Sequence, residues 1–270
     1  MRRGLLPLAL FVAAIVVGYA VQQLIAVDRQ GASEETVTID SRAVGQPLNT
    51  TVVVPADAPA EGDRSLLVFL HGRGGDEGSE LDDAFFGALA GLGSRAPIVA
   101  FPAGGDHSYW HDRADGDWGR YVVREVIPEV VRRYGIDRRR VAIGGISMGG
   151  FGAYDIARLN PGRFCAVAGH SPALWRRVGE TAPGAFDDAD DFARHDVIGA
   201  ARANPDTFGD GQLWLDAGDE DSFRPGDDAM ATALGDRVTA KTWPGGHDDD
   251  YWNEHWPDYA RFYARALARC

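Results

Sequence analysis

Lysine is almost absent from this chain of 270 residues: Lys241 is the only one, and the other basic residues are arginines. Acidic residues outnumber basic ones by 40 to 27, which gives a formal net charge of -13. A nucleic-acid-binding surface needs clustered lysine and arginine to meet phosphate groups, so no nucleic-acid partner is expected. The single dense basic run, Arg138-Arg139-Arg140, is predicted to be a solvated loop before a strand.

Cysteine is nearly as scarce, with only Cys165 and Cys270. Two cysteines make no disulfide framework, and neither stands in a metal-binding pattern such as CxxC. Cys165 lies in the apolar run FCAVAG and is predicted to be a small buried core residue. Cys270 is the last residue and is expected to be mobile. A disulfide between the two cysteines is left as an open alternative, because an oxidising compartment would allow it.

Long uncharged runs are also missing, except at the N-terminus. Arg2 and Arg3 precede an uncharged stretch over residues 5–27. Residues 1–27 are therefore predicted to be a secretory signal peptide, with cleavage after Ala20, or an uncleaved membrane anchor. In both cases the positive-inside rule places the rest of the chain outside the cytoplasm, secreted or held at the membrane.

Apolar runs of strand length alternate with helical patterns over residues 37–270, after a polar segment at 28–36 that is predicted to be a linker. Near-continuous apolar runs are typical of parallel strands buried on both faces. The predicted fold class is therefore α/β, with a mostly parallel central sheet flanked by helices in one domain. Strands are expected at 51–55, 65–72, 96–102, 141–147, 164–171, 213–218 and 237–244, the last near an edge. Helices are expected at 117–135, where Pro128 would kink or divide the helix, at 148–160 and at 251–269.

Residues 145–149 read GISMG and fit the pattern G-x-S-x-G between a predicted strand and a predicted helix. A sharp turn of this kind strains the backbone at Ser147 and exposes its hydroxyl group as a nucleophile. Glycines are needed two residues before and after it, because strand and helix come close there. A phosphate-binding loop would need a lysine, and a dinucleotide-binding turn would need G-x-G-x-x-G; neither is present. The N–H of Met148, at the helix N-terminus, is the first predicted oxyanion donor.

A serine nucleophile needs a general base, which in this architecture comes last in the chain. Of the seven histidines only His247 and His255 lie late enough. His247 follows two glycines after the last predicted strand, and it is predicted to be the base. His255 lies inside a predicted helix and is expected to serve the helix surface or packing.

The acid that orients the base is expected in the loop GDEDSF, after the strand at 213–218. Asp221 is favoured because several residues are needed to reach the imidazole, and Asp219 is the alternative. Asp216, at the end of the strand, is expected to hold the loop through backbone hydrogen bonds.

Two earlier loops are expected to border the site. The loop HGRGG at 71–75 is like the HGGG-type loop of esterases. The Arg73 N–H is its predicted oxyanion donor, with the Gly72 N–H next, and His71 is expected to be structural.

The loop at 104–113 places Tyr109 and Trp110 near the rim, either as a packed loop or as a wall that binds substrate. In the same loop, metal binding by His107, His111 and Asp112 is a weak alternative. Their spacing fits no zinc motif, so no metal is expected.

Several of these stretches together resemble the "Putative esterase" family of α/β-hydrolases, which includes S-formylglutathione hydrolases, feruloyl and acetyl xylan esterases, and secreted mycolyltransferases. The stretches are HGRGGD, SYW, GGISMGGFGAYDIARLNPGRFCAVAGHSPALW, LDAGDEDSF and PGGHDDDYW, and the resemblance spans about residues 40–268. It implies an α/β-hydrolase fold with Ser147, Asp221 and His247 as the triad. The acidic run 248–250 departs from many relatives, which have a tryptophan there, and makes the rim more acidic.

These observations predict a serine esterase that forms an acyl-enzyme and needs no metal or organic cofactor. The expected substrates are small-molecule, glycan or lipid esters. Acyl transfer to a sugar or lipid is one alternative, and a non-catalytic surface protein on a hydrolase scaffold is another. Residues 172–212 are expected to include an insertion over the pocket.

Overall fold

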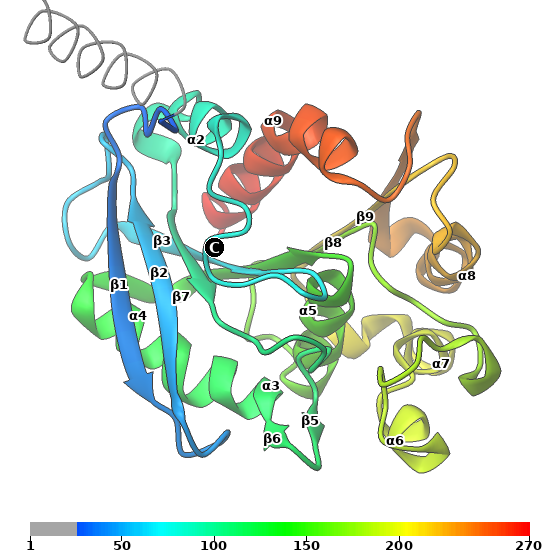
Figure 1. Cartoon of the computed structure of the whole chain (residues 1–270). Coiled ribbons are helices and arrows are strands. Elements are labelled where there is room, and N and C mark those ends of the chain that lie inside the picture. The colour runs from blue at the N-terminus through cyan, green and yellow to red at the C-terminus, as the bar shows by residue number, and fades with distance from the viewer. Residues whose placement is uncertain (1–25) are drawn as a thin grey trace, which may run out of the picture.

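An eight-stranded sheet forms the centre of the computed structural model, which describes residues 26–270 (Figure 1). The strand order is β1-β2-β4-β3-β7-β8-β9-β10, and only the β1–β2 and β2–β4 pairings are antiparallel. The sheet is therefore mostly parallel, as predicted, and the last predicted strand does lie at an edge. The strands are β1 (Ser33–Asp40), β2 (Pro47–Val54), β3 (Arg64–Leu70), β4 (Ile98–Pro102), β7 (Ile136–Ile146), β8 (Ala166–His170), β9 (Gln212–Gly218) and β10 (Val238–Trp243); β5 (Asp112–Arg113) and β6 (Gly116–Asp117) form a separate small ribbon.

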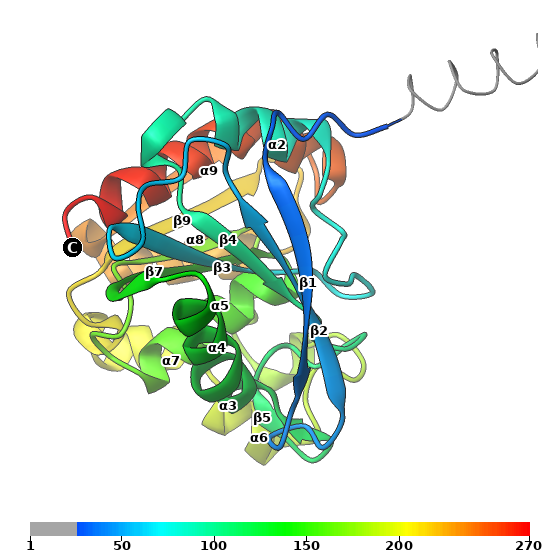
Figure 2. The ribbon, with the colours of Figure 1, turned by 90° about the vertical axis from the view of Figure 1, so that its left-hand side faces the viewer.

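Helices cover both faces of the sheet, as Figure 2 shows from the side. Helices α2 (Asp83–Ala90) and α9 (Asp249–Leu267) lie on one face, and α3 (Trp118–Tyr121), α4 (Ile127–Arg133), α5 (Met148–Leu159), α7 (Val197–Ala203) and α8 (Arg224–Leu234) pack on the other. Strand β3 shows why apolar and polar residues do not alternate along the buried strands. Leu66 and Val68 point into one hydrophobic core, and Leu67 and Phe69 point into the other.

A π-helical turn (Val122–Val126) joins α3 to α4, directly before Pro128 in the first turn of α4. Proline has no N–H to donate to the preceding turn, and its ring crowds the carbonyl four residues earlier. The wider turn absorbs this defect. The helical segment at 117–135 is therefore interrupted near Pro128, as the sequence suggested.

The sheet extends into the segment predicted to be a linker, because β1 begins at Ser33 and pairs with β2 from Ser33 opposite Val54. Most side chains of β1 are exposed, which is usual for an edge strand. An exposed polar strand has no apolar pattern, so the linker prediction for 28–36 is wrong over its last four residues.

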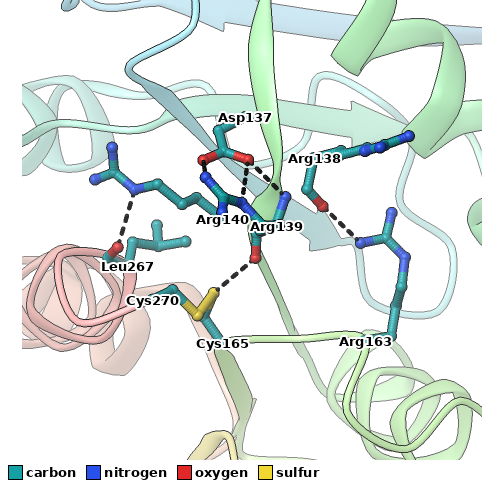
Figure 3. Close-up of a disulfide and its surroundings, with 8 residues drawn as sticks. All are labelled: Asp137, Arg138, Arg139, Arg140, Arg163, Cys165, Leu267 and Cys270. Carbon is teal, nitrogen blue, oxygen red and sulfur yellow. Dashed lines mark hydrogen bonds and ion pairs between the residues drawn. A yellow bond between two sulfur atoms is a disulfide. The ribbon is translucent and has the colours of Figure 1, made fainter.

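The basic run 138–140 lies in strand β7 rather than in a solvated loop, which corrects that prediction (Figure 3). The Arg140 guanidinium donates to the Leu267 carbonyl at 3.1 Å, and Arg163 donates to the Arg138 carbonyl at 3.1 Å. The arginines therefore tie the start of β7 to the end of α9 and to the loop before β8. Composition alone cannot reveal such partners, which are distant in sequence.

Cys165 and Cys270 form a disulfide between the loop before β8 and the C-terminus (Figure 3). Cys165 is buried, as expected. The expected mobility of Cys270 is wrong, because the bond fixes the residue beside the sheet.

The predicted signal peptide or anchor, residues 1–27, lies outside the described residues except for its last two. Among residues 26–270, no helix combines the length and the apolar character that a bilayer crossing needs.

Candidate active site

Ser147 stands alone between β7 and α5, with φ 53° and ψ -114°. A positive φ in a residue with a side chain is a strained conformation that the surrounding packing must enforce. The flanking glycines show this packing: a Cβ on Gly149 or on Gly145 would overlap the carbonyl oxygen of Leu70 at the end of β3. The G-x-S-x-G pattern is therefore a steric requirement of this turn.

His247 lies in the loop between β10 and α9 and reaches back to the serine. Its Nε2 is 2.8 Å from Ser147 Oγ, and its Nδ1 is 2.9 Å from Asp221 Oδ2. Phe223 and Trp252 hold the ring, with centroids 4.9 Å and 5.1 Å away. A neutral imidazole in this position donates from Nδ1 to the carboxylate and offers Nε2 to the serine hydroxyl.

Asp221 is the acid that contacts the imidazole, whereas Asp219 accepts the Gly245 N–H at 3.1 Å and so shapes the loop. Burial raises the pKa of Asp221, but hydrogen bonds from His247 and from the Phe223 N–H outweigh it and hold the pKa below its usual range. Asp221 therefore stays an anion beside the imidazole.

The sequence suggested that Asp216 holds the loop through backbone hydrogen bonds, but its side chain has a different role. Its fully buried carboxylate accepts four side-chain hydrogen bonds, from His170 and Trp214 at 2.6 Å and from Tyr251 and Tyr259 at 2.9 Å. The network lies beneath the site and joins β8, β9 and α9. Three of the four partners come from β8 and α9, which are distant in sequence, so the sequence carried no signal for the network.

His255 packs in α9, stacked on Trp243 with ring centroids 4.0 Å apart. The expected packing role is therefore confirmed.

The loop at 71–75 passes beside the serine, because a Cβ on Gly72 would lie 3.6 Å from the Ser147 Cβ. Within residues 26–270 the backbone N–H groups of Arg73 and Met148 have no hydrogen-bond partner, so both are free to donate to a ligand. His71 has the expected structural role, since it accepts the Gly104 N–H at 2.9 Å and bonds the Gly72 carbonyl at 2.7 Å. Burial lowers the pKa of His71, which favours this neutral form.

A cavity of about 800 Å³ opens at Ser147 and His247. Its wall combines aromatic and acidic side chains. These are Tyr109, Phe223, Trp252 and Trp256, with Glu80, Asp82, Asp106 and Asp249. One of the three acids in the run 248–250 thus faces the cavity, while Asp248 caps helix α9.

Tyr109 lines this cavity, but Trp110 does not. Both residues have positive φ, 51° and 60°, and this turn directs the indole of Trp110 inward. The indole is fully buried against Gly104 and Gly152, and its Nε1 donates to the His71 carbonyl at 3.2 Å. Of the two alternatives for this loop, packing holds for Trp110, and the candidate role of Trp110 in substrate binding is wrong. Sequence does not reveal which side of the turn a side chain takes.

Glu80 is a cavity residue that the sequence reading missed. Its Oε2 is buried and has no hydrogen-bond partner among residues 26–270. Burial, reinforced by the nearby charge of Asp249, raises the pKa of Glu80 to about 8. It stands in an acid-rich loop, so nothing in the local pattern distinguished it.

His107, His111 and Asp112 do not converge. His107 is half exposed beside Asp106, and Asp112 accepts the Arg120 N–H at 3.0 Å. His111 instead turns inward to Asp191, with Nε2 3.0 Å from Oδ2.

Residues 172–212 form a chain of short helices, among them α6 (Ala189–Arg194) and α7. The segment reaches the cavity at Ala182, and the Arg73 side chain donates to the Pro183 carbonyl at 3.3 Å. It thus contributes part of the cavity wall.

The sequence profile described as "Putative esterase" matches residues 41–265. The chain belongs to this family. The expected resemblance is therefore confirmed.

Three similar proteins put this esterase family member in context. Esterase Rv1288 of Mycobacterium tuberculosis (strain ATCC 25618 / H37Rv) is 30% identical over 147 residues, which are 50% of this chain and 31% of that protein. The chain therefore spans about a third of that relative's length. S-formylglutathione hydrolase of Paracoccus denitrificans (strain Pd 1222) is 26% identical over 265 residues, covering 84% of this chain and 91% of that one.

The solved structure of a ferulic acid esterase superposes with a TM-score of 0.73 at 20% identity, over 88% of this chain and 98% of that one. At this identity the likeness establishes the fold alone. It is the predicted α/β-hydrolase fold, a mostly parallel sheet flanked by helices.

Proposed function

We propose that this member of the esterase family is a serine esterase that hydrolyses carboxylic esters through an acyl-enzyme. The observation that carries the proposal is the continuous hydrogen-bonded chain from Ser147 through His247 to Asp221, with 2.8 Å and 2.9 Å contacts at the mouth of a cavity. Nucleophile, base and orienting acid are each within hydrogen-bonding distance of the next, as acyl transfer requires.

In the proposed reaction, Ser147 Oγ attacks the ester carbonyl carbon while His247 Nε2 takes the hydroxyl proton. Asp221 orients the imidazole and stabilises its charged form. The carbonyl oxygen becomes an oxyanion, which the N–H groups of Met148 and Arg73 stabilise. The alcohol leaves with the proton from His247, and water then cleaves the acyl-enzyme by the same steps. No metal or organic cofactor takes part.

Replacement of the nucleophile tests the proposal. We expect Ser147→Ala to lower kcat for p-nitrophenyl acetate by 10⁵-fold or more, on the order seen when a triad serine is removed. Circular dichroism checks that the fold is intact. Hydrolysis by Ser147→Ala at the unmutated rate would overturn the proposal.

Two neighbouring acids provide a matched pair for the same assay. Asp221→Asn should lose on the order of 10³- to 10⁴-fold in kcat, because the imidazole is then held in the wrong tautomer. Asp219→Asn should retain most activity. A fluorophosphonate probe should label Ser147, and a folded protein that does not react would favour a non-catalytic scaffold.

Acyl transfer to a sugar or lipid is a second candidate, because a cavity of about 800 Å³ leaves room for an acceptor alcohol beside the acyl group. Product analysis at rising acceptor concentrations separates the two reactions. Free acid alone at every acceptor concentration would argue against transfer.

We also propose that the enzyme works outside the cytoplasm, secreted or anchored by its N-terminal segment. The paired arginines before the apolar stretch support this, as does the disulfide, which persists in oxidising compartments. Alkaline phosphatase fused after Cys270 should be active, because it needs an oxidising compartment. An inactive fusion would refute the placement, and N-terminal sequencing would distinguish cleavage after Ala20 from an intact anchor.

A further inference from the structure

A second cluster of reactive side chains lies apart from the cavity and consists of His111, Asp191 and His195. His111 comes from the loop after β4, Asp191 from helix α6, and His195 from the end of α6. One nitrogen or oxygen of each lies within 4.8 Å of the others, and all three residues are buried. None of them lines the cavity at Ser147, so the proposed esterase reaction does not use them.

The orientation of His195 is the informative feature. Its Nδ1 lies 2.8 Å from Asp155 Oδ2, and Asp155 is itself paired with Arg158. A neutral imidazole has a single N–H, so donation to Asp155 leaves the lone pair of Nε2 toward Asp191 Oδ1, 3.8 Å away. A lone pair that faces a buried carboxylate is unfavourable unless Nε2 carries a second proton or a metal cation lies beside the two groups.

The other two residues present matching groups. His111 Nε2 lies 3.0 Å from Asp191 Oδ2, and the two imidazole rings are 4.5 Å apart. The Asp187 N–H donates to Asp191 Oδ2 at 2.9 Å, and Arg194 donates to Oδ1 at 3.0 Å. Oδ2 keeps a second acceptor position on the side of His111, and this position can face a cation.

We propose that His111, Asp191 and His195 bind one Zn²⁺ ion. Two imidazoles and a carboxylate suit zinc, whereas calcium and magnesium prefer ligand sets made of oxygen. A carboxylate behind a ligating histidine, as Asp155 stands behind His195, is the usual second contact in zinc sites. At Zn–N and Zn–O distances of about 2.0–2.2 Å, tetrahedral ligand atoms lie roughly 3.3–3.5 Å apart. The 3.0 Å contact between His111 and Asp191 therefore opens slightly, the wider separations within the cluster close, and a water completes the tetrahedron. His111 Nδ1, which has no partner among residues 26–270, then carries the ring proton.

The ion would fasten the loop after β4 to the helices of the segment 172–212. His111 stacks on Phe186, with ring centroids 5.1 Å apart, and Phe186 stacks on Tyr109, which lines the cavity. Zinc at this position is a structural link behind the cavity wall, not a participant in the reaction.

Zinc binding is measured on the full-length chain without a histidine tag, carrying His247→Gln. That change removes the imidazole of the candidate active site, which could also bind zinc. After chelation, titration with ZnCl₂ should show one equivalent bound. The melting temperature should rise by roughly 5–10 °C at a free zinc concentration about a hundredfold above Kd. Lack of zinc uptake by the folded protein would overturn the proposal.

Variants locate the ion. Asp191→Asn and His195→Gln should abolish the zinc-dependent shift, whereas His107→Asn, in the same loop as His111, should preserve it. If Asp191→Asn fails to fold, His195→Gln at the edge of the cluster decides the matter. Zinc binding by a folded His195→Gln protein with unchanged affinity would overturn the assignment. The readout is binding, so it stands even if the esterase proposal fails.

Discussion

At the scale of single residues, backbone conformation decides what a side chain can do. Ser147 and Trp110 both have positive φ. At Ser147 the turn brings the hydroxyl within 2.8 Å of His247, and at Trp110 it buries the indole. The sequence predicted the first because flanking glycines mark it. For Trp110 it left packing and substrate binding as alternatives, because no pattern marked the turn.

Glu80 is another case in which the surroundings change a residue's chemistry. A carboxyl group with a pKa of about 8 is largely neutral at pH 7. In that form it can donate one hydrogen bond, and it faces the cavity with an oxygen that no other described residue satisfies. The sequence shows Glu80 only as an acidic residue in a loop and does not indicate its raised pKa.

The raised pKa of Glu80 predicts a pH dependence of stability. The folded state keeps the proton up to about pH 8, whereas the unfolded chain loses it near 4.5. Glu80 therefore lowers the free energy of unfolding progressively as pH rises from about 4.5 to 8, by about 1.4 kcal/mol per unit of that window at most.

Glu80→Gln should thus be more stable than the unmutated protein at pH 8–9, by a few kcal/mol, and the advantage should vanish below about pH 4.5. Urea unfolding across pH measures this. Glu254→Gln, on the exposed side of α9, is the matched control and should show no such trend. A constant offset between Glu80→Gln and the unmutated protein at every pH would contradict the assigned pKa.

At the scale of elements, one buried carboxylate joins two strands and a helix. Asp216 in β9 accepts bonds from His170 in β8 and from two tyrosines of α9. An ionised carboxylate has about four acceptor positions, and four donors fill them here. Because β9 and α9 lead into the loops with Asp221 and His247, the network also sets their spacing.

Asp216→Asn should lower the free energy of unfolding by about 3–5 kcal/mol, because the amide nitrogen cannot accept from the donors that face it. Denaturant unfolding measures this, and the exposed Asp210→Asn is the control. A loss below about 0.5 kcal/mol would mean that the network adds little to the stability of these elements.

At the scale of the whole molecule, the disulfide closes a long covalent loop, because Cys165 and Cys270 are 105 positions apart in sequence. The loop contains Asp221, His247 and all of α9. Cross-linking two distant positions removes conformations from the unfolded chain, and the effect grows with loop length.

Cys270→Ser should therefore lower the free energy of unfolding by about 2–4 kcal/mol, with activity retained at 25 °C because both catalytic loops lie away from the bond. Reduction of the unmutated protein by dithiothreitol should have the same effect, and Cys270→Ser should not respond to it. Equal unfolding midpoints with and without the bond would contradict a stabilising role.

Seven strands of the central sheet, the helices α5 and α9 and the serine turn were determined by the sequence itself, whereas β1, α2 and α8 were not predicted. Apolar runs and glycine positions are local, and burial on both faces of a sheet leaves a direct imprint on them. Chain order then limited the base to His247 and His255, and the position of His247 in a loop favoured it. The loop length needed to reach the imidazole favoured Asp221 over Asp219, which agrees with the observed contacts.

Only the tertiary structure decided the rest. It turned Trp110 inward, placed the arginine run in a strand, and gave Glu80 its raised pKa. It also brought His111, Asp191 and His195 together across 84 residues of chain. Each of these features depends on partners that are distant in sequence and on burial. The local pattern of residues indicates neither the partners nor the burial.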